Sequence, residues 1–256
     1  MTQQISASSM IQFFGCPASY GYSRKYQRVG IAQALVDGGD AHALMQGKAV
    51  KASPRAQAYA ETFKKVAEDW EFTLHPEWQE VEQVFELRPG IMFKRIIDAI
   101  ITLNDGVRVL VDWKTTSNLK YWPQITQAKI QAGFATVSPK AANFQAVSYL
   151  IPPPAEELER LGLDAWPTTI YFVVGTPEGE GHIYPYSLKD GDVDDFMGAA
   201  RLMVGAINNN LLPRVKGDKC GVGGPMECPY LQVCYQVKGW DKFYTTKEIK
   251  DDTARD

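Results

Sequence analysis

The feature that most constrains the fold is a pair of β-patterned segments joined by Asn-Asp-Gly at 104–106. Residues 92–103 and 107–115 are rich in isoleucine, valine and leucine, which favour strands, and Asn-Asp-Gly is typical of a tight turn. Each segment carries a single acidic residue, Asp98 in the first and Asp112 in the second. The pattern predicts an antiparallel hairpin, and its register decides whether the two carboxylates meet.

Whether the two carboxylates meet depends on the length of the turn. A two-residue turn at 105–106 sets Asp98 opposite Trp113, so that Asp98 and Asp112 point to opposite faces of the sheet. A three-residue loop at 104–106, with its glycine in the left-handed conformation, sets Asp98 directly opposite Asp112. Two carboxylates placed so among apolar residues repel each other unless a cation lies between them. Both registers stay open at this point, and the longer loop predicts a metal site.

The residues after the second acid fit that prediction. Asp112 and Lys114 alternate with Trp113 along the strand, so the acid and the base share a face. Carboxylates are the ligands that Mg²⁺ and Mn²⁺ prefer, and a nearby ammonium group stabilises the charge that develops on a phosphate during hydrolysis. The pattern therefore indicates a metal-dependent phosphodiesterase, although Asp-x-Lys alone is more often an ordinary surface ion pair.

Composition sets the class of protein. The chain has 256 residues, of which 45% are hydrophobic and 22% charged, as in a soluble globular protein of one large or two small domains. No apolar run approaches ~18 residues and the N-terminus lacks the pattern of a signal peptide, so we expect a cytoplasmic protein with no membrane partner. The net charge of −3 neither requires nor excludes a nucleic-acid partner.

The remaining periodicity predicts an α/β fold with an αββ(β)αβ core. The expected helices are one capped by Ser8 or Ser9 and ending before Cys16, one at 29–36 that breaks at Gly38-Gly39, one that Asp40 caps and that contains His42, one that starts at Ser53-Pro54, one at about 140–150, and one from Asp190 or Asp192 to about 211. The expected strands are 80–87, 92–103, 107–115, 168–176 and 182–187. Residues 117–140 are expected to lie over the site as an irregular segment.

The order of Asp98 and then Asp112-Trp113-Lys114 resembles the PD-(D/E)XK nuclease superfamily. The branch that it resembles is the RecB-type one, with the AddB-like and CRISPR-adaptation nucleases that carry an iron–sulfur cluster. Three further features agree with that branch: the G-x-x-x-H pattern of Gly38 and His42, the Q-x-x-x-Y pattern of Gln145 and Tyr149, and an acid on the preceding strand, which we assign to Glu82.

The resemblance implies a fold and a set of roles. The fold is a restriction-endonuclease-like core, a mixed sheet flanked by helices, in one nuclease domain over 1–256 with its catalytic core at about 38–190. The implied metal ligands for Mg²⁺ or Mn²⁺ are His42, Asp98, Asp112 and the Trp113 carbonyl. The implied catalytic residues are Asp98, Asp112, Lys114, Glu82, Gln145 and Tyr149, of which the last two position the phosphate or the DNA backbone.

The four cysteines predict a second metal centre. Cys16, Cys220, Cys228 and Cys234 suit either tetrahedral zinc or a [4Fe–4S] cluster, and the lack of a C-x-x-C pair weakens the zinc reading. The resemblance implies the iron–sulfur cluster, with structural zinc as the alternative. Ligation would then staple the N-terminal segment, with Cys16, to the C-terminal residues 212–240.

Two positions depart from the branch. Its members usually have glycine three residues before the first aspartate, where this chain has Arg95, and that arginine is interpreted as altering the approach of DNA or as contacting a phosphate. Cys220 and Cys228 are separated by seven residues, where two are usual in the branch.

The resulting prediction is a metal-dependent DNA nuclease. We expect an exonuclease on single strands or DNA ends, acting in recombination, repair or phage DNA metabolism. The alternative is a non-catalytic module that binds DNA or the proteins of a recombination or replication complex. Because the chain retains Asp98, Asp112 and Lys114, the enzyme is favoured.

Overall fold

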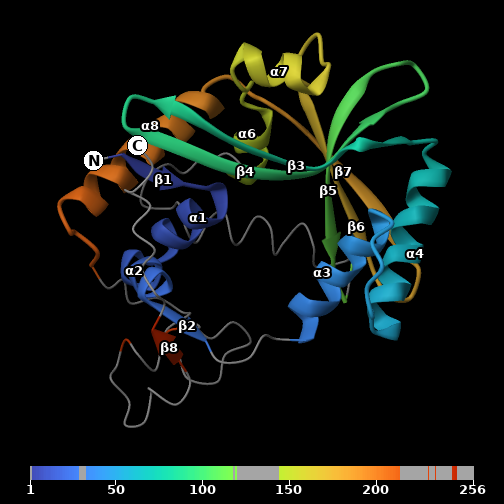
Figure 1. Cartoon of the computed structure of the whole chain (residues 1–256), viewed down its shortest axis with the longest axis horizontal. Coiled ribbons are helices and arrows are strands. Elements are labelled where there is room, and N and C mark those ends of the chain that lie inside the picture. The colour runs from blue at the N-terminus through green and yellow to red at the C-terminus, as the bar shows by residue number, and fades with distance from the viewer. Residues whose placement is uncertain are drawn as a thin grey trace.

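The computed structural model describes residues 2–28, 33–117, 119, 144–213, 230, 234 and 244–246. A six-stranded mixed sheet forms the centre of the molecule, in the order β1-β4-β5-β6-β7, with β3 also paired to β4 (Figure 1). Its strands are β1 (Gln3–Ile5), β3 (Thr73–Arg88), β4 (Ile91–Thr102), β5 (Arg108–Thr115), β6 (Thr169–Gly175) and β7 (Gly181–Ser187).

The connectivity explains why the sheet is mixed. β3, β4 and β5 follow one another as antiparallel neighbours, and β5 then pairs with β6 in parallel. A parallel pair needs a crossover, and α6 (Phe144–Leu150) and α7 (Ala155–Leu161) lie in that connection. β6 and β7 close the sheet as an antiparallel hairpin. The predicted α/β core, a mixed sheet flanked by helices, is confirmed.

Helices cover both faces of the sheet (Figure 1). On one face, α6 and α7 pack their apolar residues against β4, β5 and β6. On the other, α3 (Gln33–Met45) and α4 (Pro54–Asp69) pack against β5, β6 and β7. α1 (Ala7–Gly15) and α8 (Asp192–Asn208) share a third apolar cluster with the far end of β3 and β4. The middle of β5 is therefore buried from both sides.

The β4–β5 hairpin has the three-residue loop. The paired residues run from Thr102 opposite Arg108 to Ala99 opposite Val111, and the Leu103 amide donates to the Val107 carbonyl at 2.8 Å. Gly106 has a φ of +82°, the left-handed conformation that this loop requires. This is the register of the longer loop, which runs toward Asp98 opposite Asp112, but the paired ladder ends one residue earlier, at Ala99 opposite Val111.

The N-terminal and C-terminal segments lie together. β2 (Tyr26–Arg28), which follows α2 (Pro17–Lys25), pairs in antiparallel fashion with β8 (Tyr244–Thr246). The ring centroids of Tyr22 and Tyr230 are 6.4 Å apart. The ring contact lies between the two segments that the cysteine staple was expected to join, and the strand pairing lies just beyond them, after residue 240.

Several helix predictions were wrong in detail. α3 runs unbroken through Gly38-Gly39, so neither the predicted break nor an Asp40 cap exists. Ser6, rather than Ser8 or Ser9, caps α1, and Gly191 is the N-cap of α8. β3 begins at Thr73, seven residues before the predicted start, and its pairing with β4 is interrupted between Leu74 and Gln79. β1 and α7 were not predicted, and the predicted irregular segment at 117–140 lies almost wholly outside the described residues.

Candidate active site

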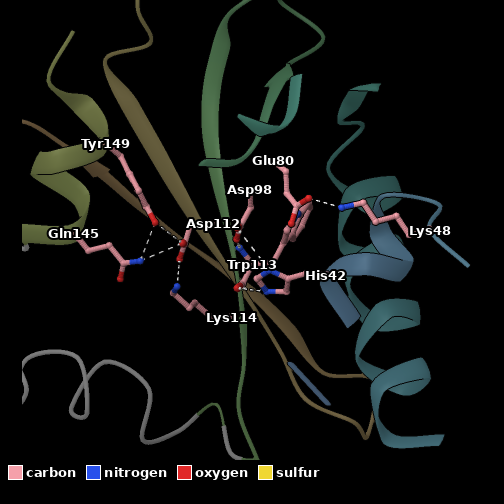
Figure 2. Close-up of polar contacts among 9 residues, drawn as sticks. All are labelled: His42, Lys48, Glu80, Asp98, Asp112, Trp113, Lys114, Gln145 and Tyr149. Carbon is pink, nitrogen blue, oxygen red and sulfur yellow. Dashed lines mark hydrogen bonds and ion pairs between the residues drawn. The ribbon is translucent and has the colours of Figure 1, made fainter. Parts of the chain in front are cut away.

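Asp112 lies at the centre of the candidate site, in the buried middle of β5 (Figure 2). Its side chain is only 1% exposed. From α6, the Gln145 amide donates to Oδ1 of Asp112 at 3.3 Å and the Tyr149 hydroxyl donates to the same oxygen at 3.4 Å. Gln145 and Tyr149 are four residues apart, so one face of α6 presents both to the carboxylate. The sequence pattern Q-x-x-x-Y thus serves here to orient an acid.

Lys114 supplies the positive charge next to that acid. Its Nζ lies 2.6 Å from Oδ2 of Asp112, an oxygen that has no hydrogen-bond partner of regular geometry within the described residues. Burial raises the pKa of Asp112 to about 6; the Lys114 charge opposes this rise and the nearby Asp98 charge adds to it. Burial alone would lower the pKa of Lys114, yet the charges of Asp112 and Asp98 raise it. Because a single ammonium group compensates the buried charge of Asp112, a second cation nearby would stabilise the carboxylate further.

α3 brings His42 to the opposite face of β5. Nε2 of His42 lies 2.9 Å from the Trp113 carbonyl, and Nδ1 lies 3.6 Å from Oδ1 of Asp98. Gly38 is four residues earlier on the same helix face, and a Cβ there would lie 3.3 Å from Oγ1 of Thr115. The glycine therefore lets α3 approach β5 closely enough for the imidazole to reach the strand backbone. Burial lowers the pKa of His42, but Asp98 outweighs it and the net pKa is raised.

Asp98 lies where β4 and β5 separate. The ladder between the two strands ends at Ala99 opposite Val111, and beyond it Oδ2 of Asp98 accepts the Trp113 amide at 2.8 Å. Ile97 and Ile100, three residues apart, both join the apolar cluster on the α6 face, so the alternation of β4 slips at this point. The slip turns Asp98 toward the neighbourhood that His42 and Asp112 share (Figure 2).

Seven of the predicted site residues therefore gather around the middle of β5. They are His42 from α3, Asp98 from β4, Asp112, Trp113 and Lys114 from β5, and Gln145 and Tyr149 from α6 (Figure 2). Because alternate residues of a strand point to opposite faces, Asp112 is reached from the α6 side, while the Trp113 ring packs against Phe63 of α4 on the other side.

Glu82 does not lie in this group. Its side chain is 53% exposed and forms an ion pair with Lys94 at 2.6 Å, opposite Ile96 rather than Asp98. The acid that lies opposite Asp98 is Glu80, because Gln79 pairs with Ala99 and Val81 pairs with Ile97. The structure thus places Glu80, two residues before the predicted Glu82, across from Asp98. The only sign of this in the sequence is that the two-residue alternation typical of a strand begins at Glu80.

Glu80 is held at the site by Lys48. The two side chains form an ion pair, and the hydrogen bond from Lys48 is the main cause that lowers the pKa of Glu80, while the Asp98 charge opposes it. Glu80 has a φ of +49°, a left-handed conformation that is uncommon for a glutamate. This backbone conformation turns the strand next to the site, and Figure 2 shows the Glu80 side chain beside Asp98 and His42.

Arg95 cannot contact DNA, contrary to its interpretation from the sequence. It is 3% exposed, and its guanidinium group donates to the carbonyl oxygens of Ser148, Tyr149 and Ile151 at the end of α6. Burial lowers the pKa of Arg95 to about 9. Its position in the interior is the physical reason why a phosphate contact is excluded.

The candidate metal ligands have the right chemistry for a hard cation, but their donor atoms do not point to one common position. Within the described parts of the chain, no three His, Cys, Asp or Glu side chains form a group that could hold an ion. Internal partners engage the donors instead: the Trp113 amide on Asp98, the Lys114 ammonium on Asp112, and the Trp113 carbonyl on His42. The 2.9 Å between Nε2 of His42 and that carbonyl is close to the ~3 Å that separates adjacent ligands of an octahedral ion bound at ~2.1 Å.

The cysteine prediction falls partly on residues that the structure does not describe. Cys16, at the start of α2, and Cys234 are described, and neither is in a disulfide there. Cys220 and Cys228 lie outside the described residues. The four-cysteine cluster, whether iron–sulfur or zinc, stays a prediction.

The comparisons with known proteins give no family. No family model matches the chain, and no curated protein matches it significantly. Among solved structures, a protein of Eubacterium rectale described as an exonuclease is 14% identical, with 92% of this chain and 93% of that one covered and a TM-score of 0.49. The alkaline exonuclease of Laribacter hongkongensis is 8% identical over 81% of this chain and 89% of its own, with a TM-score of 0.39. At these values the similarity carries no argument about activity.

None of the described helices has both the length and the apolar character needed to cross a lipid bilayer.

Proposed function

We propose that the chain is a Mg²⁺- or Mn²⁺-dependent DNA phosphodiesterase. The observation that carries the proposal is the buried Asp112 with Lys114 at 2.6 Å, next to Asp98 and His42. An ordinary surface ion pair between Asp112 and Lys114 would be exposed and would contribute little. Burying this pair among further ionisable groups is costly, and such costs are typical of functional sites.

The proposed ligands are Asp98, Asp112, the Trp113 carbonyl and His42. Two carboxylates, a carbonyl and an imidazole form a donor set that suits Mn²⁺, and their oxygens suit Mg²⁺. When bound, the metal supplies Lewis acidity toward a phosphate oxygen and lowers the pKa of a water.

The other side chains of the site act around that centre. Lys114 holds its ammonium group beside Asp112, where it can orient a water and stabilise the charge that develops on the phosphate. Gln145 and Tyr149 fix the Asp112 carboxylate through Oδ1, while Oδ2 faces the Lys114 ammonium group, which a bound metal would have to displace or share this oxygen with. Glu80, beside Asp98, takes the supporting role that the sequence assigned to Glu82.

The proposed substrate is single-stranded DNA or a DNA end, cleaved as by an exonuclease in recombination, repair or phage DNA metabolism. Exposed cations at the end of α2, Arg24 and Lys25, and at the start of α4, Lys51 and Arg55, support contacts with a phosphate backbone.

A [4Fe–4S] cluster on the four cysteines, with zinc as the alternative, would stabilise the N-terminal and C-terminal segments that β2 and β8 already join. Recombination or replication proteins are the proposed protein partners.

The test is degradation of end-labelled single-stranded and double-stranded DNA with Mg²⁺, Mn²⁺, Ca²⁺ or EDTA. Wild type is expected to degrade at least one substrate with Mg²⁺ or Mn²⁺ only, and Asp112→Ala and Lys114→Ala are expected to lose the activity. Lys94→Ala is the matched control, because Lys94 pairs with Glu82 on the exposed face of the same sheet. If wild type, Asp112→Ala and Lys114→Ala behave alike, the enzyme reading fails and the non-catalytic alternative replaces it. Circularised DNA as a further substrate separates exonuclease from endonuclease action.

A further inference from the structure

The end of α6 lacks its usual hydrogen-bond donors. In a helix each carbonyl accepts from the amide four residues later, so Ser148 would accept from residue 152 and Tyr149 from residue 153. Residues 152–154 are all proline, which has no amide hydrogen. The Ser148 and Tyr149 carbonyls, at the buried end of a short helix, are therefore left without these backbone partners by the sequence itself.

Arg95 supplies the missing donors. Its Nη1 lies 2.6 Å from the Ser148 carbonyl, 3.0 Å from the Tyr149 carbonyl and 2.7 Å from the Ile151 carbonyl. The Trp166 indole adds a second donor to the Tyr149 carbonyl at 2.8 Å. A side chain of β4 thus caps the helix that the chain cannot cap locally.

The surroundings fix the guanidinium group in one orientation. It lies over the rings of Phe85 and Trp166, with 5.0 Å and 4.7 Å to the two ring centroids. Nε donates to Oε1 of the buried Gln83 at 2.7 Å. Within the described residues no carboxylate forms an ion pair with Arg95, so carbonyl oxygens and aromatic faces compensate the buried charge.

This cap is connected directly to the site. Tyr149 accepts from Arg95 through its backbone carbonyl and donates to Asp112 through its side-chain hydroxyl. Gln145, one turn earlier on α6, contacts the same carboxylate oxygen. Arg95 also lies on β4 only three residues before Asp98. One side chain therefore joins the strand that carries the first acid to the helix that orients the second.

We infer that Arg95 is a positioning residue for Asp112, acting through α6. It holds the Q-x-x-x-Y helix against β4 so that Gln145 and Tyr149 keep the Asp112 carboxylate in place. The expected effect of Arg95 on kcat rests on the proposed function, whereas its effect on the position of α6 does not. Glycine, usual at this position in the nucleases that the chain resembles, has no side chain to cap the helix. Lysine is one atom shorter and lacks the Nε–H that donates to Gln83, so it cannot keep both the Gln83 contact and the carbonyl contacts.

The main experiment compares Arg95→Lys with wild type in the full chain as purified. We expect kcat on DNA to fall ~10- to 100-fold with KM unchanged, as for residues that orient metal ligands, and Mn²⁺ affinity to fall with it. Amide hydrogen exchange is expected to become faster in α6 and to stay unchanged in α4. Arg160→Lys is the matched control, because Arg160 is an exposed arginine of α7 paired with Glu157 and should leave all three readouts unchanged.

A second pair of variants covers the case in which Arg95→Lys does not fold. Trp166→Phe keeps an aromatic ring but removes the indole donor to the Tyr149 carbonyl together with part of the buried bulk, so a smaller loss of the same kind is expected. Pro153→Ala returns an amide hydrogen four residues after Tyr149. We expect it to restore part of the kcat and of the α6 protection that Trp166→Phe loses.

The outcomes decide between roles. A folded Arg95→Lys or Trp166→Phe variant with wild-type kcat, Mn²⁺ affinity and α6 exchange overturns the inference. A raised KM for DNA at unchanged kcat overturns it as well, because that result indicates a direct contact with DNA. If wild type proves not to degrade DNA, the proposed function fails, yet α6 exchange and Mn²⁺ affinity still decide whether Arg95 positions the helix.

Discussion

α3 and α6 approach the same strand from opposite faces, and they are held in place by different means. α3 has 13 residues and packs close to β5 through Gly38, so that His42 reaches the Trp113 carbonyl. α6 has seven residues and depends on a buried arginine from β4. A long helix is thus positioned by a close backbone approach, whereas a short helix without its own terminal donors needs a cap from elsewhere.

The largest expected effect tests the close approach of α3. Gly38→Leu should push α3 away from β5, because even a Cβ at this position lies 3.3 Å from Oγ1 of Thr115. Displacing His42 by about 1 Å is expected to lower kcat on DNA ~100-fold. Gly39→Leu is the matched control, since a Cβ at Gly39 meets nothing within 4 Å. Equal activities of the two variants would show that α3 does not depend on this contact.

The second prediction concerns the pH dependence of Mn²⁺ affinity. It compares Asp112, which the α6 side contacts, with His42, which α3 brings to the other side of β5. The pKa of Asp112, raised by burial to about 6, means that the folded protein holds this proton more tightly than an unfolded chain does. A metal must displace the proton, so Mn²⁺ affinity should be constant well above pH 6 and fall ~10-fold per unit below it. The pKa of His42, also a proposed ligand, is raised above its ordinary value, so in wild type the fall begins at a higher pH than Asp112 alone would give and becomes steeper below it.

The measurement is Mn²⁺ titration of wild type and of His42→Gln from pH 5 to pH 8. We expect the slope below pH 6 to be shallower in His42→Gln, because only the Asp112 proton remains to be displaced. A wild-type affinity that does not change over this range would contradict the assignment of Asp112 as a ligand.

The smallest expected effect tests the side-chain contact of α6. Tyr149→Phe removes the hydroxyl that lies 3.4 Å from Asp112 and keeps the buried ring. A hydrogen bond of this kind contributes about 1 kcal/mol, so kcat should fall roughly fivefold. Tyr184→Phe, on β7, is the control. A loss as large as that expected for Arg95→Lys would mean that the Tyr149 hydroxyl does more than orient the carboxylate.

Much of the site was predictable because its patterns are local. The alternation of Asp112, Trp113 and Lys114 follows from the two-residue period of a strand. The four-residue spacings of Gly38 with His42 and of Gln145 with Tyr149 follow from the helix period. Each pattern needs only the backbone geometry of its own segment. The arrangement of these patterns around one site was implied only by the resemblance to the PD-(D/E)XK nucleases. It also depended on the length of the loop at 104–106, which the sequence left open.

Several positions that differ from the prediction depend on contacts between distant segments. Glu80, and not Glu82, lies across from Asp98 because the pairing of β3 with β4 sets Glu82 opposite Ile96. α3 continues through Gly38-Gly39 because packing against β5 outweighs the ~1 kcal/mol that a glycine costs a helix. Arg95, expected to face DNA, is buried because the end of α6 needs its donors.

The sequence by itself determined which residues share a strand face or a helix face, since the periods of 2.0 and 3.6 residues are properties of the backbone. It also determined that residues 152–154 cannot cap α6, since proline has no amide hydrogen. Only the tertiary structure decided that the loop at 104–106 has three residues, that Glu80 lies opposite Asp98 and that Arg95 caps α6. The reason is physical: register and capping are settled by contacts between segments far apart in the chain, whose energies no local pattern contains.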